Sequence, residues 1–340
     1  MDHFWKKVTI RLERGIMGIL LDNSIGRNES MLKKIKVIVL GFCCSVILIS
    51  CNTYKQASCP YLLKQIYMCD TETGWALSRE NEVLFTKEGI QNFQEIKQVT
   101  DISSYTDDFI NATFIDEYCA YITYFAADNE NLVVEYTNDG GVLWEQINIK
   151  YGDYAEICDA GSAFINFADN KEGYLLYCST PGMGQMTKLL FHIDGIGKTF
   201  TFIADLTDEI WGYPQGLSFA NKEIGYIAVN YHGNSEYMYK TEDGGKTWES
   251  VEIYTQSDNV NYIESYTPVF TKKDRKKGML VLKEVTIEDI TYKVFMTNDQ
   301  GNKWIESGKI PSDSLLQYSV VSDRKIYIID TMGRLYEIFN

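Results

Sequence analysis

One pattern recurs three times in this chain, as Thr137-Asn-Asp139-Gly-Gly141-Val-Leu-Trp144, Thr241-Glu-Asp243-Gly-Gly245-Lys-Thr-Trp248 and Thr297-Asn-Asp299-Gln-Gly301-Asn-Lys-Trp304. The three stretches align without gaps to Ser/Thr-x-Asp-x-Gly-x-x-Trp. An Asp in a turn accepts hydrogen bonds from nearby backbone amides, a Gly adopts conformations that a Cβ hinders, and a Trp covers the turn with apolar surface. The pattern therefore predicts a hairpin turn in which these residues are structural.

The pattern belongs to a longer repeat. Weaker copies are Thr86-Lys-Glu88-Gly with Phe93, and Asp194-Gly-Ile-Gly197 with Phe200, so the acidic position recurs about every fifty residues. A second motif, in which an apolar or aromatic residue follows a turn, occurs six times, as Gly74-Trp75-Ala76, Glu117-Tyr118-Cys119, Gly173-Tyr174-Leu175, Gly225-Tyr226-Ile227, Gly278-Met279-Leu280 and Lys325-Ile326-Tyr327. Each unit then has four strand-like runs, which is one blade of a propeller.

The prediction is an all-β fold, a six-bladed β-propeller of four-stranded antiparallel blades. The last unit has only three expected strands, at Leu315 to Val321, Lys325 to Ile329 and Arg334 to Phe339. We expect the stretch from Thr53 to Leu63 to supply the missing outer strand, because this would close the ring and remove an exposed edge. Seven blades are the alternative, if a degenerate unit lies near the N-terminus.

These motifs resemble the Asp-box, or BNR repeat, of sialidase-like propellers. The resemblance to active sialidases would imply an arginine cluster and an Arg-Ile-Pro motif. The chain after Cys51 has only Arg79, Arg275, Arg324 and Arg334, and it has no Arg-Ile-Pro, which disfavours sialidase activity. Arg275 lies within the charged run 272–277, which we interpret as a solvated turn. The glycine-aromatic motif also resembles that of photosystem II assembly-factor propellers, which implies a protein-binding scaffold without catalysis.

The N-terminal part has the pattern of an export signal. Residues 31–50 have a basic start, a short apolar run and a small-residue end, and Leu48-Ile49-Ser50-Cys51 resembles the lipobox of bacterial lipoproteins. We expect Cys51 to be lipidated and residues 51–60 to be a linker before a propeller at 61–340. An ordinary signal peptide or an uncleaved anchor is the alternative. Residues 1–30 precede the signal, and we interpret them as a misassigned start or a disordered extension.

The charge of the chain limits its partners. The net charge is −15, and the first fifty residues are net basic, so the rest is more acidic still. Such a surface repels phosphate backbones, so we expect no nucleic acid partner and membrane contact only through the lipid anchor. Among the cysteines, Cys59 with Cys69 and Cys158 with Cys178 are candidate bridges, with buried free thiols as the alternative.

No catalytic residue, cofactor or metal site is predicted. We expect a monomeric lipoprotein of the bacterial cell envelope, at the cell surface or in the periplasm, that binds a protein, peptide or glycan. The alternative is a glycoside hydrolase or lyase that uses an Asp/Glu pair. Propellers usually bind where connections between blades surround the central funnel. Aromatic and acidic side chains there suit sugar rings or basic peptides. They form a candidate binding face of Tyr105, Asp107, Tyr154, Trp211, Tyr213, Tyr231 and His232.

Overall fold

The computed structural model describes residues 53–102, 110–127, 132–149, 161–169, 172–182, 186–194, 199–230, 237–254, 259–312, 314–322 and 325–339. Residues Ile49–Asn340 form one compact unit. The regular elements in the described ranges are all strands, labelled β1 to β25 in chain order. Within these ranges, no helix is long and apolar enough to cross a membrane.

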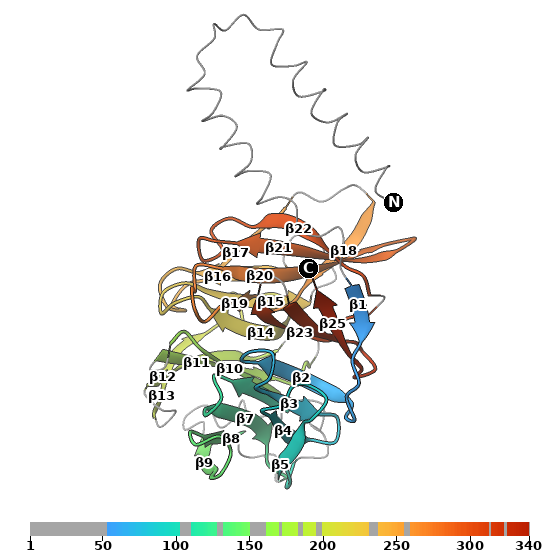
Figure 1. The fold of residues 1–340 in the computed structure, drawn as a ribbon. Helices are drawn as coiled ribbons and strands as arrows, with labels where there is room; N and C mark the ends of the chain where they lie inside the picture. The colour runs from blue at the N-terminus through green and yellow to red at the C-terminus, as the bar shows by residue number, and fades with distance from the viewer. Residues whose placement is uncertain are drawn as a thin grey trace, which may run out of the picture. The chain divides into compact units, whose positions relative to one another are not determined.

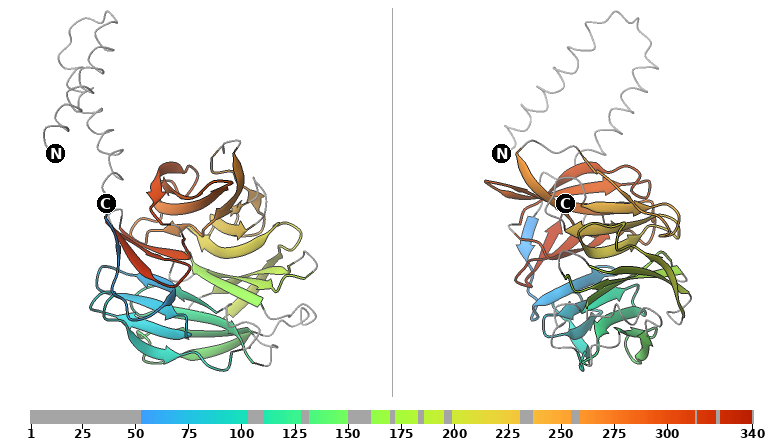
Figure 2. Two further views of the ribbon diagram at one scale, coloured as in Figure 1. Left: turned by 90° about the vertical axis from the view of Figure 1, so that its right-hand side faces the viewer. Right: turned by 180° about the vertical axis from the view of Figure 1, so that it is seen from behind.

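The strands form six antiparallel sheets, each of which is a blade (Figure 2). The chain builds five of them from the inner strand outward, and in the sixth the N-terminal strand β1 is the outer strand. This confirms the predicted six-bladed β-propeller. From inner to outer strand the blades are as follows: blade 1, β2 (Leu63–Met68), β3 (Gly74–Ser78), β4 (Glu82–Thr86) and β5 (Gln94–Gln98); blade 2, β6 (Asn111–Phe114), β7 (Ala120–Phe125), β8 (Leu132–Thr137) and β9 (Glu145–Ile149); blade 3, β10 (Gly161–Phe167), β11 (Glu172–Ser179), β12 (Lys188–Asp194) and β13 (Thr199–Asp205); blade 4, β14 (Tyr213–Phe219), β15 (Gly225–Asn230), β16 (Met238–Thr241) and β17 (Glu249–Ser250); blade 5, β18 (Val260–Ser265) with β19 (Val269–Phe270), then β20 (Gly278–Thr286), β21 (Ile290–Thr297) and β22 (Ile305–Ile310); and blade 6, β23 (Gln317–Ser322), β24 (Lys325–Ile329), β25 (Leu335–Phe339) and β1 (Thr53–Gln56).

The ring is closed by the two ends of the propeller. β1 pairs antiparallel with β25, from Thr53 opposite Phe339 to Gln56 opposite Tyr336. In Figure 1 the blue β1 lies beside the dark red β25. β1 lies within the stretch from which we expected the missing outer strand, and before residue 61, where we placed the start of the propeller. Because β1 covers the edge of β25, this blade has four strands like the others.

The alternation of strand directions gives the ring two faces. The face that carries the connections between blades is here called the D–A face. The face that carries the turns after the inner strands is called the A–B face. The inner strands run from the D–A face to the A–B face. The D–A face also carries the turns between second and third strands, and the A–B face carries the three repeat turns. This assignment follows from the antiparallel order in every sheet.

The three repeat turns are held by the hydrogen bonds that their sequence predicts. In blade 5, the Thr297 hydroxyl donates to Asp299 Oδ1 at 2.7 Å, and the Lys303 N–H donates to the same oxygen at 3.0 Å. The Gly301 N–H donates to Thr297 Oγ1 at 3.0 Å, and Gly301 has a φ of 85°. The matching turns of blades 2 and 4 contain the same bonds. The Lys303 N–H and the Thr297 hydroxyl lower the pKa of the Asp299 carboxyl, as expected for an anion that accepts several donors.

In blades 1, 3 and 4 the second motif joins the blade to the next one by a hydrogen bond. Trp75 Nε1 donates to the Asp116 carbonyl at 2.7 Å, the Tyr174 hydroxyl to the Lys222 carbonyl at 2.7 Å, and the Tyr226 hydroxyl to the Gln300 carbonyl at 2.9 Å. Each acceptor lies in a turn of the following blade. The ring of the aromatic residue therefore packs between two blades, and its N–H or hydroxyl donates a hydrogen bond at the A–B face.

In blade 2 the predicted register of this motif is wrong by three residues. β7 begins at Ala120, so Tyr121 takes the place that Trp75 has in blade 1, and Tyr118 lies in the turn with 53% of its surface exposed. The Asp116 carboxylate accepts hydrogen bonds from the N–H groups of Tyr118 and Cys119, which extends the turn to Cys119. The triplet 117–119 is therefore turn rather than strand.

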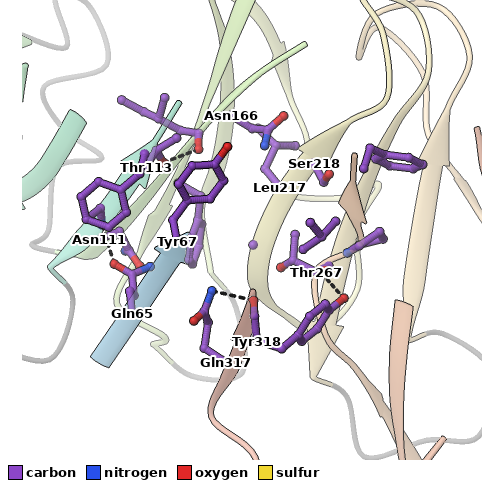
Figure 3. A pocket seen from close by; sticks show the side chains of 18 of the residues that line it. Gln65, Tyr67, Asn111, Thr113, Asn166, Leu217, Ser218, Thr267, Gln317 and Tyr318 are labelled. Carbon is purple, nitrogen blue, oxygen red and sulfur yellow. Dashed lines mark hydrogen bonds between the residues drawn. The ribbon is translucent and has the colours of Figure 1, made fainter. Parts of the chain in front are cut away.

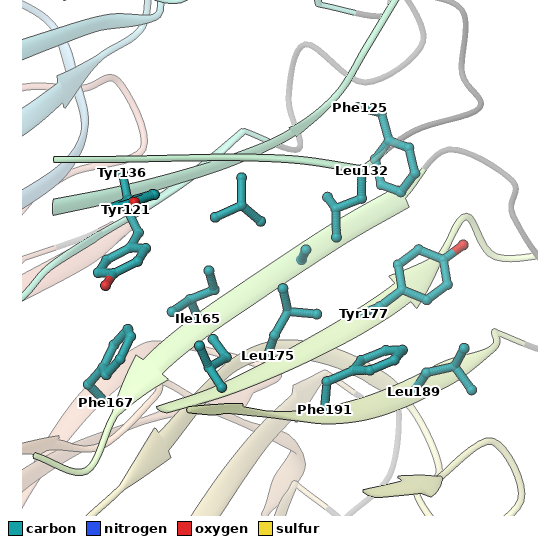
Figure 4. Close-up of a cluster of buried hydrophobic side chains, with 13 residues drawn as sticks. Tyr121, Phe125, Leu132, Tyr136, Ile165, Phe167, Leu175, Tyr177, Leu189 and Phe191 are labelled. Atoms are coloured by element: carbon teal, nitrogen blue, oxygen red, sulfur yellow. The ribbon is translucent and has the colours of Figure 1, made fainter. Parts of the chain in front are cut away.

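The core lies between the blades, since each sheet buries both faces. Figure 4 shows one such interface, where side chains of blade 2 meet those of blade 3. Its labelled members are Tyr121, Phe125, Leu132, Tyr136, Ile165, Phe167, Leu175, Tyr177, Leu189 and Phe191. The Tyr121 and Phe167 rings lie 4.9 Å apart between centroids. Because each blade depends on its neighbours for burial, the ring is stable as a whole.

Candidate functional site

The inner strands surround the axis of the ring and have one edge without a strand partner. Side chains of neighbouring blades satisfy part of that edge. Gln65 Oε1 accepts from the Ala112 N–H at 2.6 Å, and Asn166 Oδ1 accepts from the Phe219 N–H at 2.8 Å. Comparable bonds at three other interfaces join Thr113 to the Ile165 carbonyl, Tyr318 to the Thr267 carbonyl, and Gln317 to the backbone of Ile66. The inner surface is therefore rich in amides and hydroxyls that the fold holds in place.

A cavity of about 290 Å³ lies among these inner strands. All six blades contribute to its wall, as Figure 3 shows with labelled side chains from each of them. The wall combines amides and hydroxyls, such as Gln65, Asn111, Gln215 and Thr267, with rings such as Tyr67. An apolar wall with a few fixed polar groups is the usual composition of a small-ligand site.

Two cationic side chains also line the cavity, and they come from the turn that follows β19. Arg275 Nη1 donates to the Phe219 carbonyl of blade 4 at 3.0 Å, and Lys272 Nζ lies 4.7 Å from the centre of the Tyr67 ring of blade 1. The turn of blade 5 thus extends across the A–B end of the cavity. Sequence reasoning missed this role, because a run of charged residues in a turn normally faces solvent. Among the described lining residues, Lys272 and Arg275 are the only charged ones.

The environment of these two cations is partly desolvated. Burial lowers the pKa of the Lys272 ammonium, while the neighbouring Cys69 and Asp116 act in the opposite direction. Burial also lowers the pKa of the Arg275 guanidinium. Arg275 stays cationic at neutral pH, because a guanidinium is not deprotonated in proteins. The cavity therefore has a positive A–B end in a protein of strongly negative net charge.

Two residues of the predicted binding face are among the described residues, and both lie where the chain enters blade 4 at the D–A face. Trp211 is 61% exposed in the connection from β13 to β14, and its N–H donates to the Tyr239 hydroxyl at 3.0 Å. Tyr213 is the first residue of β14, and Gln215 on the same strand lines the cavity. The other predicted face residues, Tyr105, Asp107, Tyr154, Tyr231 and His232, lie outside the described residues, as does Cys51.

The described cysteines are free thiols, namely Cys59, Cys69, Cys119 and Cys178. Cys59 and Cys69, one of the two candidate pairs, are therefore not bridged, and Cys158 of the other pair lies outside the described residues. Cys178 is buried, and desolvation raises the pKa of its thiol to about 12. A protonated, buried thiol behaves as a small apolar side chain.

No family model and no curated protein matches this chain. Solved structures do match over most of its length. One described as YCF48 bound to D1 peptide has a TM-score of 0.52 at 14% identity, covering 86% of this chain and 96% of that chain. A mutant of AofleA from Arthrobotrys oligospora has a TM-score of 0.50 at 12% identity, covering 85% and 87%. An ulvan lyase of family PL25, bound to a saccharide of GlcA and Rha3S, has 0.50 at 11% identity, covering 85% and 76%.

The chain is a β-propeller. At these identities the likeness concerns the fold alone, since one propeller scaffold carries unrelated binding and catalytic functions.

Proposed function

We propose that this protein is an exported, lipid-anchored binding propeller that holds a protein, peptide or glycan at the D–A face. The observation that supports this most is the exposed Trp211 at the D–A face of a ring whose central cavity is lined by fixed amides and hydroxyls. Aromatic rings at the surface gain much apolar contact on binding at a small entropic cost, and neighbouring amides give orientation. This arrangement suits an extended ligand whose end or side group enters the cavity.

The solved neighbours are compatible with such a role at a coarse level. One is in complex with a peptide and another with a saccharide, and both ligands are polymers with repeated polar groups. Cleavage by an Asp/Glu pair, the alternative function, requires two carboxyl groups facing the substrate. The described cavity wall supplies two cations and no carboxyl group, so a carboxyl pair would have to lie outside that wall. Binding is therefore the better-supported proposal.

The aromatic residues at the D–A face provide the first test. A Trp211→Ala, Tyr213→Ala double variant should capture its ligand at least about tenfold less well, because buried aromatic anchors contribute most of the energy of an interface. The measurement is a glycan array together with a pull-down from envelope extract, using the full-length protein. Tyr118→Ala is the matched control, since Tyr118 is exposed on the A–B face. Equal capture by all three proteins would overturn the proposed face, and cleavage of a captured glycan would support the alternative.

The anchor is tested separately. Cys51 lies two residues before Thr53, the first residue of β1, so a lipid on Cys51 would tether blade 6 directly to a membrane. Cys51→Ser should abolish incorporation of labelled palmitate and move the protein from the membrane fraction to the soluble fraction, because acyl chains supply the membrane affinity. Cys59→Ser is the control. Unchanged labelling of Cys51→Ser would refute the lipid anchor.

A further inference from the structure

We propose that the central cavity binds a ligand through a carboxylate, which Lys272 and Arg275 hold at the A–B end. This deepens the proposed binding function and rests on it, since it names the chemistry of the group that enters the cavity. Both cations line the cavity, and both belong to the turn between β19 and β20. They approach it from the same side, and Arg275 still has guanidinium N–H groups beyond the one bonded to the Phe219 carbonyl.

The two cations lack a carboxylate partner within the described residues. No Asp or Glu oxygen there lies within 4.0 Å of Lys272 Nζ or of the Arg275 guanidinium. Asp116, which influences Lys272 electrostatically, uses Oδ1 for the N–H groups of its own turn. Asp169, which influences Arg275, likewise accepts from the Glu172 N–H. The positive charge at the cavity wall is therefore only weakly compensated by the protein.

Several partly buried lysines of the described residues are paired with a carboxylate, whereas the buried Lys188 bonds to the Met186 carbonyl instead. Lys283 lies 2.7 Å from Glu264, Lys293 lies 2.8 Å from Glu284, and Lys97 lies 3.3 Å from Glu135. An acidic protein has ample carboxylates for such pairs, and burying a charge without a partner costs free energy. Arg275 likewise bonds to a carbonyl, and Lys272 is exposed, so no carboxylate of the described residues neutralises either charge and a ligand anion can supply that partner.

The size and polarity of the cavity favour a carboxylate on a small polar body. About 290 Å³ is the space of roughly ten waters, enough for the last residues of a peptide or for one or two sugar rings. The amides and hydroxyls of the wall suit such a body, and a guanidinium forks onto a carboxylate with two parallel bonds. A phosphate dianion would meet more repulsion from the net charge of −15. The C-terminus of a peptide and a uronic acid both carry a carboxylate, and they differ in the rest of the molecule.

The test compares each acid with a neutral analogue, by calorimetric titration of the full-length protein in detergent. The probes are acetyl-trialanine and its amide, galacturonic acid and galactose, and inorganic phosphate. We expect one acid to bind at least about tenfold more tightly than its neutral partner, as for hydrogen bonds to a charged group, and to weaken with added salt. If the peptide acid and its amide differ in affinity, the ligand is a peptide, and if galacturonic acid and galactose differ, the ligand is a glycan. Equal affinity of acids and neutral partners, or tighter binding of phosphate, would overturn the proposal.

Variants in the turn between β19 and β20 show which residues cause the preference for the acid. Lys272→Gln should remove the preference for the acid, whereas Lys273→Gln, an equal charge change at an exposed residue outside the cavity wall, should keep it. Arg275→Gln removes both the charge and the bond to the Phe219 carbonyl, so a loss of binding in that variant could come from misfolding. Arg275→Lys keeps the charge and should therefore keep the preference for the acid. An unchanged preference in Lys272→Gln would refute the assignment. If the aromatic variant loses capture while acids and neutral partners bind alike, the proposed function stands and the carboxylate site fails.

Discussion

A chain that begins at Ala57 should be less stable than one that begins at Thr53 by about 2 to 4 kcal/mol, and it should associate at micromolar concentration. The shortened chain lacks β1, whose backbone pairs with β25 from Thr53 to Gln56. It also loses the stacking of Tyr54 on Tyr336, whose ring centroids lie 4.8 Å apart. The loss of the Tyr54 stacking and of the net hydrogen bonds of β1 sets this magnitude.

The uncovered edge explains the expected association. Without β1, the outer edge of β25 presents unpaired backbone groups, and such an edge pairs readily with a second chain. Thermal unfolding and sedimentation velocity measure the two effects. Tyr54→Ala in the longer chain is the control, because it removes the stacked ring and keeps the strand, so it should lose stability without associating. A shortened chain that is as stable and as monomeric as the longer one would show that β1 does not hold the ring closed.

The number of blades could be predicted from sequence because its signals are local. An Asp that accepts amide hydrogen bonds and a glycine with positive φ determine a turn within a few residues, as at Asp299 and Gly301. Three such turns at a near-constant spacing define the repeat, and the missing strand of the last unit pointed to Thr53 and its neighbours. Each of these inferences needed only short-range chemistry and a count of strands.

Two features required the folded ring. In blade 2, Tyr118 and Tyr121 fit the same motif, and only the turn capped by Asp116 decides that Tyr121 packs between the blades. The cationic end of the cavity depends on contacts between residues far apart in sequence, since Lys272 lies over Tyr67 and Arg275 bonds to Phe219. A local pattern has no means of showing that a charged turn will lie across an axis formed by other blades.

The candidate site was predictable in part. Trp211 and Tyr213 were identified because aromatic residues stood in an expected connection between blades. The structure places Trp211 in that connection and Tyr213 at the start of β14, and their role in binding stays a prediction. The amides of the inner strands gave no signal, because Gln65 and Asn166 look like ordinary polar residues of a strand. Their role as links to the next blade appears only when the edges of neighbouring inner strands are compared.

Trp75→Ala should lower the free energy of unfolding by about 3 to 5 kcal/mol, the range for removing a fully buried Trp. Trp75 is 0% exposed, and its ring lies 5.6 Å from that of Phe114 in blade 2 and 4.5 Å from that of Phe85 in its own blade. The variant would open a cavity between blades 1 and 2 and leave the Asp116 carbonyl without its donor. The midpoint of urea unfolding, followed by circular dichroism, gives the change.

Trp75→Phe separates the two parts of this effect, since a phenyl ring fills most of the space and lacks the N–H. We expect it to cost about 1 to 2 kcal/mol, mainly for the unsatisfied carbonyl and the smaller ring. Tyr118→Ala is the surface control, because the Tyr118 side chain is exposed in the turn of blade 2, and it should change stability by less than about 0.5 kcal/mol. If Trp75→Ala were no more destabilising than Tyr118→Ala, the motif residue would not be what joins blades 1 and 2. An intermediate value for Trp75→Phe would instead show that both the ring and its N–H contribute to the contact between blades.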